Sequence, residues 1–182
     1  PPLPGLTTRV SVASEGTQGN VDSSGGSLSA DGRFVAFSSP ADNLVPNDTN
    51  AMSDIFVHDR QTGETSRVSV AMDGTQANNH SFEAEISPDG RYVTFASMAS
   101  NLVSNDTNFR RDIFVHDRET HITTRVSVNS NGGQADGDSW IPSISGDGRF
   151  VAFHSLAKNL VPGWDEGLPY LQAHDGQTGE AF

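Results

Sequence analysis

The chain has 182 residues, no cysteine and a formal net charge of −12 at neutral pH. A chain of this length usually forms a single domain. The negative charge argues against nucleic-acid phosphates and anionic membrane surfaces as partners, because both require a basic face. The lack of cysteine excludes disulfide bonds and thiolate metal sites, and no apolar run is long enough to cross a membrane.

The sequence repeats itself at a fixed period of 58 residues, without insertions. The segment at 7–12 returns at 65–70 and at 123–128, and an Asp-Gly-Arg motif recurs with the same offset. A fixed period of this size predicts stacked supersecondary units of equal construction.

Each repeat contains four strand-like runs and no helical periodicity. In the first repeat, a short run at 27–29 is followed by an Asp-Gly turn and by a run at 33–37 that is rich in β-branched and aromatic residues. A long polar loop leads to a third run at 54–58, and a Thr-Gly turn leads to a fourth at 67–70. Four antiparallel strands per unit of this length predict an all-β fold made of β-propeller blades, three per chain.

The second repeat resembles a known family. Its hairpin Ile-Ser-Pro-Asp-Gly-Arg-Tyr-Val-Thr-Phe at 86–95, followed by Asp-Ile-Phe-Val-His-Asp-Arg at 112–118, is similar to the repeat of TolB-like, WD-repeat-like β-propellers. The resemblance extends over residues 7–180 and implies a fold but no single function, because such propellers support many unrelated activities. Together with the calcium-like loops described below, it favours an extracytoplasmic location, periplasmic or secreted.

The phase of the repeat leaves both ends of the chain incomplete. Residues 7–12 match the outer strand of a blade but precede the first blade, and the third blade stops where its own outer strand should begin. The expected organisation is a linker at 1–6 and a three-blade unit at 7–182, with blades at 24–70, 82–128 and 140–182. Open strand edges are a liability, and propellers typically have about 4–8 blades. We therefore expect a homodimer in which each copy's residues 7–12 complete the other's third blade, giving a six-bladed ring.

The contact between the two copies, called the joint below, is expected to involve the exchanged strand and the third blade. The third blade is where the repeat pattern breaks. The expected joint residues are Arg9, Val10, Val12, Trp164, Tyr170 and Leu171. The alternative is that the chain is a fragment of a longer propeller, or an engineered repeat whose main property is self-assembly.

Residues that recur in all three copies are expected to be structural. The histidine of the third strand recurs at His58, His116 and His174. We expect it to form structural hydrogen bonds rather than bind metal, because equivalent positions lie far apart on a ring. The expected ion pairs within the blades are Arg33–Asp59, Arg91–Asp117 and Arg149–Asp175.

The loops between the second and third strands carry oxygen-rich motifs, and the antiparallel strand order places all long loops on one face. Closely spaced Asp and Asn oxygens suit a hard cation such as Ca²⁺. The same residues also suit Asx turns, in which these side chains bind nearby backbone amides. The candidate calcium ligands are Asn47, Asp48, Asn50 and Asp54 in the first loop, and Asn105, Asp106, Asn108 and Asp112 in the second.

Unrepeated aromatic and polar residues gather at the start of each blade's first strand, next to the central axis. Aromatic rings beside polar oxygens are typical of a platform for a sugar or another small molecule. The expected ligand-binding residues are His80, Phe82, Glu83, Glu85, Asp138 and Trp140.

The sequence contains no recognisable catalytic constellation. It therefore favours a non-catalytic binding or scaffold propeller that assembles by strand exchange and presents its polar loop face to a protein, a glycan or a cation. The alternative is a calcium-dependent hydrolase or lyase with its site at the mouth of the central channel. The candidate residues for that activity are His80, Glu83, Glu85 and Asp138.

Overall fold

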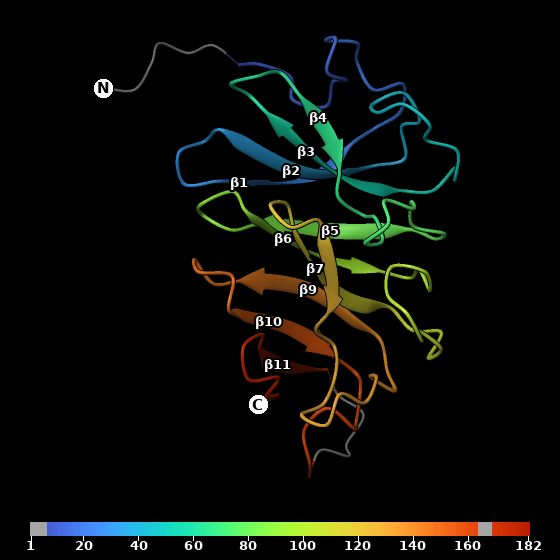
Figure 1. Cartoon of the computed structure of the whole chain (residues 1–182), viewed down its shortest axis with the longest axis vertical. Helices are drawn as coiled ribbons and strands as arrows, with labels where there is room; N and C mark the ends of the chain where they lie inside the picture. Colours follow the sequence, from blue (N-terminus) through green and yellow to red (C-terminus); the bar gives the residue numbers. More distant parts are fainter. Residues whose placement is uncertain (1–6, 164–168) are drawn as a thin grey trace.

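The computed structural model describes residues 7–163 and 169–182, which form three antiparallel sheets stacked along the long axis of the molecule (Figure 1). The first sheet contains β1 (Ser24–Leu28), β2 (Phe34–Ser39), β3 (Asp54–Asp59) and β4 (Thr65–Arg67). The second contains β5 (Ser81–Ile86), β6 (Tyr92–Ser97), β7 (Asp112–Asp117) and β8 (Ile122–Arg125). The third contains β9 (Ser139–Ile144), β10 (Phe150–Ser155) and β11 (Tyr170–Asp175). The all-β, three-blade architecture expected from the sequence is confirmed.

Strands that follow one another in the chain are also neighbours in each sheet. The long polar loops and the Asp-Gly hairpins lie on opposite sides of the stacked sheets, and the described chain begins at residue 7 and ends at residue 182 at opposite ends of the stack (Figure 1). In the described part of the chain, no helix is long and apolar enough to span a membrane.

The Asp-Gly hairpins are fixed by side-chain hydrogen bonds and by contact with the neighbouring blade. Ser29 Oγ donates to Asp31 Oδ1 at 2.6 Å, and the same oxygen accepts a hydrogen bond from Arg33 N at 2.9 Å. Gly90 of the second hairpin adopts φ 78°, and a Cβ there would lie 2.3 Å from the ring of Phe34. Glycine is thus required both by the turn and by the close approach of two blades.

An arginine–aspartate pair ties the second strand of each blade to the end of the third strand. The pairs are Arg33–Asp59, Arg91–Asp117 and Arg149–Asp175, with Nη2–Oδ2 distances of 2.7, 2.7 and 2.6 Å. The hydrogen-bonded guanidinium holds the pKa of each aspartate well below its usual value. All three pairs expected from the sequence are confirmed.

The hydrophobic core lies between the blades. Ile55 of β3 belongs to one buried cluster with Phe95 of β6, and Ile113 of β7 belongs to another with Phe153 of β10. None of these four side chains is more than 2% exposed. Each blade therefore buries one face of its sheet against the next blade, which is how propellers are stabilised.

The Nδ1 atom of the third-strand histidine has a side-chain partner in the first two blades but none among the described residues in the third. The bonded pairs are His58–Thr65 and His116–Thr123, with Nδ1–Oγ1 distances of 2.8 and 2.9 Å. Ala181 occupies the equivalent position in the third blade, and among the described residues the buried His174 Nδ1 has no partner. The expectation of structural hydrogen bonds is confirmed for the first two histidines. It is wrong for His174 Nδ1, because alanine lacks the hydroxyl group.

The outer strands differ in extent from those expected. β4 covers Thr65–Arg67 instead of 67–70, although Val68 N still donates to Ile55 O at 2.8 Å. In the third blade, Phe182 exchanges two backbone hydrogen bonds with Ala173 of β11, at 2.8 and 2.9 Å. The last two residues thus begin an outer strand in the third blade, which was predicted to lack one.

Residues 7–11 belong to no strand within the described chain, and Val12 forms a single bridge with Gln18. The carbonyl oxygen of Val12 accepts a hydrogen bond from Thr65 Oγ1 at 2.5 Å. The same bond joins Val70 O to Thr123 Oγ1 one repeat later. Val12 therefore contacts the first blade in the same way as Val70, one repeat later, contacts the second blade.

Candidate functional site

The inner strands β1, β5 and β9 each belong to a different blade and contact the next one along. The ladder between β5 and β6 is interrupted between Phe82 and Glu85, and that between β1 and β2 is interrupted between Ser24 and Ser27. Bulges of this kind re-aim side chains and are frequent next to functional sites. The bulges place unrepeated side chains at the inner edge of the blades.

Two side chains in these bulges sit on left-handed backbone. Glu83 has φ 57°, and Ile141 at the equivalent position in β9 has φ 50°, whereas the first blade uses Gly25 there, with φ 69°. Positive φ is unfavourable for residues with a side chain, and most of all for a β-branched one. Glu83 Oε2 accepts a hydrogen bond from Ile141 N at 2.7 Å. The carboxylate of the second blade is thus fixed to the strained backbone of the third.

Two cavities flank Glu83, and each is about as large as a small ligand site. The first, of about 350 Å³, lies between the first two blades and is lined by Ser24, Gly25, Ser38, Phe82, Glu83 and Arg111. The second, of about 310 Å³, crosses the three inner strands and is lined by Gly26, Ser27, Glu83, Ala84, Glu85, Ile141 and Pro142.

The first cavity, called the Phe82 cavity below, combines an aromatic face with groups that donate and accept hydrogen bonds. Arg111 Cζ lies 5.8 Å from the centroid of the Phe82 ring. Arg111 Nε is buried and has no hydrogen-bond partner in the part of the chain that the structure describes. The hydroxyl oxygens of Ser24 and Ser38 lie 3.0 Å apart. With the Glu83 carboxylate, the Phe82 cavity contains a cation, an anion, two hydroxyl groups and a ring.

The second cavity contains a carboxyl group with a shifted pKa. Burial raises the pKa of Glu85, and a hydrogen bond from Ser143 Oγ, at 3.3 Å, partly opposes this shift. A carboxyl group with a raised pKa keeps its proton to higher pH and can donate it.

The structure separates the expected ligand-binding residues into two groups. Phe82, Glu83 and Glu85 line the two cavities. His80 Nδ1 instead accepts a hydrogen bond from Ser53 N at 3.0 Å, and Asp138 Oδ1 accepts one from Arg111 N at 3.0 Å, so both anchor the end of a long loop. Trp140 stacks on His154 with ring centroids 6.3 Å apart. Ligand binding by any of the six stays a prediction.

Arg111 is the charged lining residue that is missing from the set predicted from the sequence. It ends the long loop of the second blade, where the first and third blades have Ser53 and Pro169. The loss of repeat identity at this position was visible in the sequence. The contact of Arg111 with the cavity could not be predicted from the sequence, because the fold alone brings the end of the loop against the bulge of β5.

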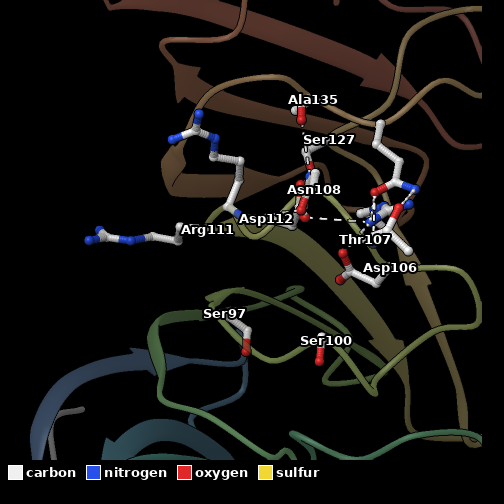
Figure 2. Close-up of polar contacts among 12 residues, drawn as sticks. Ser97, Ser100, Asp106, Thr107, Asn108, Arg111, Asp112, Ser127 and Ala135 are labelled. Atoms are coloured by element: carbon white, nitrogen blue, oxygen red, sulfur yellow. Dashed lines mark hydrogen bonds and ion pairs between the residues drawn. The ribbon is translucent and has the colours of Figure 1, made fainter.

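The oxygen-rich loop of the second blade surrounds an arginine. Arg125 Nη1 lies 2.9 Å from Asp106 Oδ1 and 3.5 Å from Asp112 Oδ2. Asn108 Nδ2 donates to Asp112 Oδ2 at 2.8 Å, and Ser127 Oγ donates to Asp112 Oδ1 at 2.5 Å. Figure 2 shows Asp106, Asn108, Asp112 and Ser127 together. The Arg125 guanidinium thus occupies the position between Asp106 and Asp112 where a bound cation would neutralise the two carboxylates.

The first loop repeats this arrangement. Arg67 Nη1 lies 3.0 Å from Asp48 Oδ1 and 3.3 Å from Asp54 Oδ2. Burial raises the pKa of Asp48, and the guanidinium opposes the shift. Asn47 and Asn105 both have φ 59°, a conformation that asparagine tolerates in turns. Across residues 7–163 and 169–182, no group of three or more His, Asp or Glu side chains is placed to hold a metal ion. Calcium binding stays a prediction, and it would require displacement of the arginines.

Five of the six expected joint residues belong to the described part of the chain and lie at the two ends of the stack. Leu171 is 70% exposed, and Tyr170 begins β11 at the position of Asp54 and Asp112. Arg9 Nη1 donates to Gln18 Oε1, and Val10 and Val12 are partly buried. Trp164 lies outside the described residues.

Comparisons with known proteins support the fold. No protein-family model and no curated protein matches the chain. The chain superimposes on the structure of a putative TolB from Agrobacterium tumefaciens with a TM-score of 0.58 and 19% identity, covering 90% of this chain and 49% of that one. It thus spans about half the length of that protein.

Two further solved structures have the same fold. An oligogalacturonate lyase in complex with manganese matches with a TM-score of 0.52 and 16% identity, over 86% of this chain and 37% of that one. The β-propeller domain of the Trilobed protease from Pyrococcus furiosus, described as having an open velcro topology, matches with a TM-score of 0.51 and 14% identity, over 89% and 41%. The TolB-like β-propeller fold expected from the sequence is confirmed. At these identities the likeness extends to the fold alone.

Proposed function

We propose that this chain is a non-catalytic binding module of the β-propeller type that takes a protein or glycan ligand at the inner edge of its blades, on the loop face. The observation that carries the proposal is the Phe82 cavity. A ring, a guanidinium, a carboxylate and two hydroxyl groups converge there, and few precisely placed polar groups around an aromatic surface are the usual composition of a ligand site.

Backbone strain supports the same location. Glu83 and Ile141 adopt a conformation that the first blade gives to glycine, and strained residues concentrate at ligand sites and switches. The hydrogen bond from Ile141 N fixes one oxygen of the Glu83 carboxylate. The carboxylate is therefore oriented before a ligand arrives, which lowers the entropy cost of binding.

The test replaces residues of the second blade with the equivalent residues of the first blade, which the same fold already accommodates. Phe82→Ser combined with Glu83→Gly gives the second blade the residues that the first blade has at Ser24 and Gly25. We expect an NMR titration with a panel of oligosaccharides and short peptides to shift the amides of residues 82, 83 and 111. The double variant should weaken any such ligand at least tenfold. Shifts confined to other surfaces, or equal binding by the variant, would contradict the proposal.

A second candidate function, hydrolysis or lyase chemistry at the channel mouth, rests on Glu85. Its raised pKa suits proton donation, and Glu83 lines the same cavity. Turnover of pectate or another polysaccharide by the purified chain, lost in Glu85→Gln, would favour this candidate over a binding module. Calcium dependence of that turnover would add the loops near Asp54 and Asp112 to its machinery.

We further propose that two copies assemble into a six-bladed ring. Leu28 is 59% exposed, whereas Ile86 and Ile144 at the equivalent positions are 3% and 8% exposed. At the other end of the stack Leu171 is 70% exposed, whereas Ile113 at the equivalent position is fully buried. The two end faces thus carry the same apolar positions that meet between neighbouring blades, and a second copy can bury them in the same way.

In such a ring, residues 7–12 of one copy would extend the third blade of the other. Phe182 already occupies the start of that edge, so the incoming strand must displace the last two residues or continue from them. The incoming Arg9 would meet Tyr170 in place of the aspartate that holds Arg67, and a guanidinium can stack on a tyrosine ring. We propose an extracytoplasmic location for this assembly.

Leu171→Glu tests the ring without altering the Phe82 cavity. A charge at this position would have to be buried in the joint, so we expect the variant to be monomeric. The matched control is Ile122→Glu, since Ile122 is 44% exposed on an outer strand and should tolerate charge. If the chain is instead a piece of a longer propeller, both variants and the wild type should have the same mass.

A further inference from the structure

The tip of the second long loop carries different side chains from the first loop on the same backbone. Asn108 Nδ2 donates to Asp112 Oδ2 and to Ala135 O at 2.8 and 3.0 Å. Asn50 makes the equivalent bonds in the first loop with the same two distances. The tip sequence changes from Ala-Met-Ser at 51–53 to Phe-Arg-Arg at 109–111. Because the asparagine determines the loop, the fold does not require the Phe-Arg-Arg sequence.

Phe109 is the most exposed large apolar side chain of the described residues. It is 94% exposed and has φ 55°, and Ala51 has the same φ. A single exposed apolar residue is ordinary on a protein surface. The Phe109 ring contributes nothing to the core, and its backbone has a positive φ, which is unfavourable for a large side chain. The equivalent loop of the first blade has the same backbone conformation with alanine at this position.

The two arginines that follow are unpaired in a strongly acidic chain. Arg110 has no side-chain hydrogen bond or ion pair within residues 7–163 and 169–182, and Arg111 only lies over Phe82. Five other arginines contact carboxylates: Arg33, Arg67, Arg91, Arg125 and Arg149. In Figure 2, Arg111 points away from the acidic cluster around Asp112. Neither guanidinium group is therefore neutralised by a carboxylate of the described residues.

We propose that Phe109, Arg110 and Arg111 form a docking site for an acidic peptide segment of a partner protein. Carboxylates of the segment bind the two guanidinium groups, and an apolar side chain of the segment covers the ring. Aromatic and arginine side chains are the residues most enriched at the energetic centres of protein interfaces. The net charge of −12 opposes every acidic partner, and most strongly a nucleic acid or an anionic lipid surface, which would bring many phosphates against the molecule. Two adjacent cations can neutralise the few carboxylates of a short segment, so an acidic peptide is the partner that fits this site.

This inference rests on the proposed binding function and names its partner class. Arg111 also lines the Phe82 cavity, so the docking site continues into that cavity. The test therefore has to separate the loop tip from the cavity. Phe109→Ala with Arg110→Met gives the tip the residues of the first loop and leaves Arg111 in place.

The probe is a fluorescein-labelled octapeptide of alternating glutamate and leucine, followed by fluorescence anisotropy at 50 and 200 mM NaCl. We expect binding that weakens with salt, and at least tenfold weaker binding by the Phe109→Ala, Arg110→Met variant. The Phe82→Ser, Glu83→Gly variant should weaken peptide binding less than the tip variant does, because it leaves Phe109 and both arginines in place. The reverse exchange, Ala51→Phe, Met52→Arg and Ser53→Arg, should add a second binding equivalent.

Three outcomes would overturn the inference. Equal binding by the tip variant and the wild type would remove the loop tip as the site. Loss of binding only in the cavity variant would preserve the proposed function and reject the tip. Salt-dependent binding of polygalacturonate, but not of the peptide, that is lost in the tip variant would assign the tip to an acidic glycan instead.

Discussion

Replacing Ala181 by threonine should stabilise the third blade, because it restores a hydrogen bond that the other two blades make. His174 is 5% exposed, and its Nδ1 has no partner among the described residues. Thr123 Oγ1 in the second blade lies 2.9 Å from the histidine Nδ1 and donates to Val70 O at 2.5 Å. A hydroxyl group at 181 would meet the corresponding imidazole and carbonyl groups.

The magnitude follows from the burial of the imidazole. A net hydrogen bond contributes about 0.5–1.5 kcal/mol, and a buried polar atom without a partner costs about 1–3 kcal/mol. Position 181 lies at an edge with one strand neighbour, so water can partly relieve the unpaired nitrogen, and we take the lower part of these ranges. We expect Ala181→Thr to raise the free energy of unfolding by about 1–2 kcal/mol, and each kcal/mol to raise Tm by about 2–4 °C.

Urea denaturation monitored by tryptophan fluorescence measures this gain. Ala181→Val is the control, because valine has the shape of threonine without the hydroxyl group and should give less than half of the gain. Thr123→Val should have the opposite effect, since it leaves His116 without its partner. Equal stabilisation by threonine and valine would refute the hydrogen-bond reasoning and attribute the effect to β-propensity or packing.

Three further predictions concern charge. Burial, helped by the nearby charge of His121, lowers the pKa of His116 from 6.5 to about 4. As the pH falls, the unfolded chain binds this proton before the folded chain does, so the free energy of unfolding should decrease as the pH drops from 6.5 towards 4. An NMR titration that gives a pKa near 6.5 for His116 would contradict the burial argument. Asp112→Ala should lower the free energy of unfolding by about 3 kcal/mol, because it removes one carboxylate partner of the Arg125 side chain, which is only 9% exposed. A loss below about 1 kcal/mol in urea denaturation would contradict this prediction. Calcium titrated calorimetrically should bind Arg125→Met more tightly than wild type if the loops are its site, and equal affinities would exclude them.

Much of the fold follows directly from local sequence patterns. The Asp-Gly turns at Gly32 and Gly90, the β-branched second strands and the period of 58 residues determine the hairpins and the blade count. The arginine–aspartate pairs were also predictable, because Arg33 and Asp59 recur with the repeat. These features depend on residues close in the chain or repeated identically.

The candidate site was only partly predictable, because its geometry depends on contacts between blades. Strand patterns do not reveal that Glu83 and Ile141 sit in bulges with positive φ. The Asn-Asp motifs suggested a cation site, but the arginine that occupies it comes from the outer strand, 19 residues after Asp48 in the case of Arg67. The missing partner of His174 was visible in the sequence as alanine at 181.

The absolute molar mass of the purified chain, measured by light scattering during size-exclusion chromatography, tests the proposed ring most directly. The chain mass is 19.4 kDa. Two copies that cover each other's exposed end faces would give twice this mass at micromolar concentration, with a monomer in the Leu171→Glu variant. A wild-type mass equal to that of one chain, unchanged by the substitution, would contradict the ring.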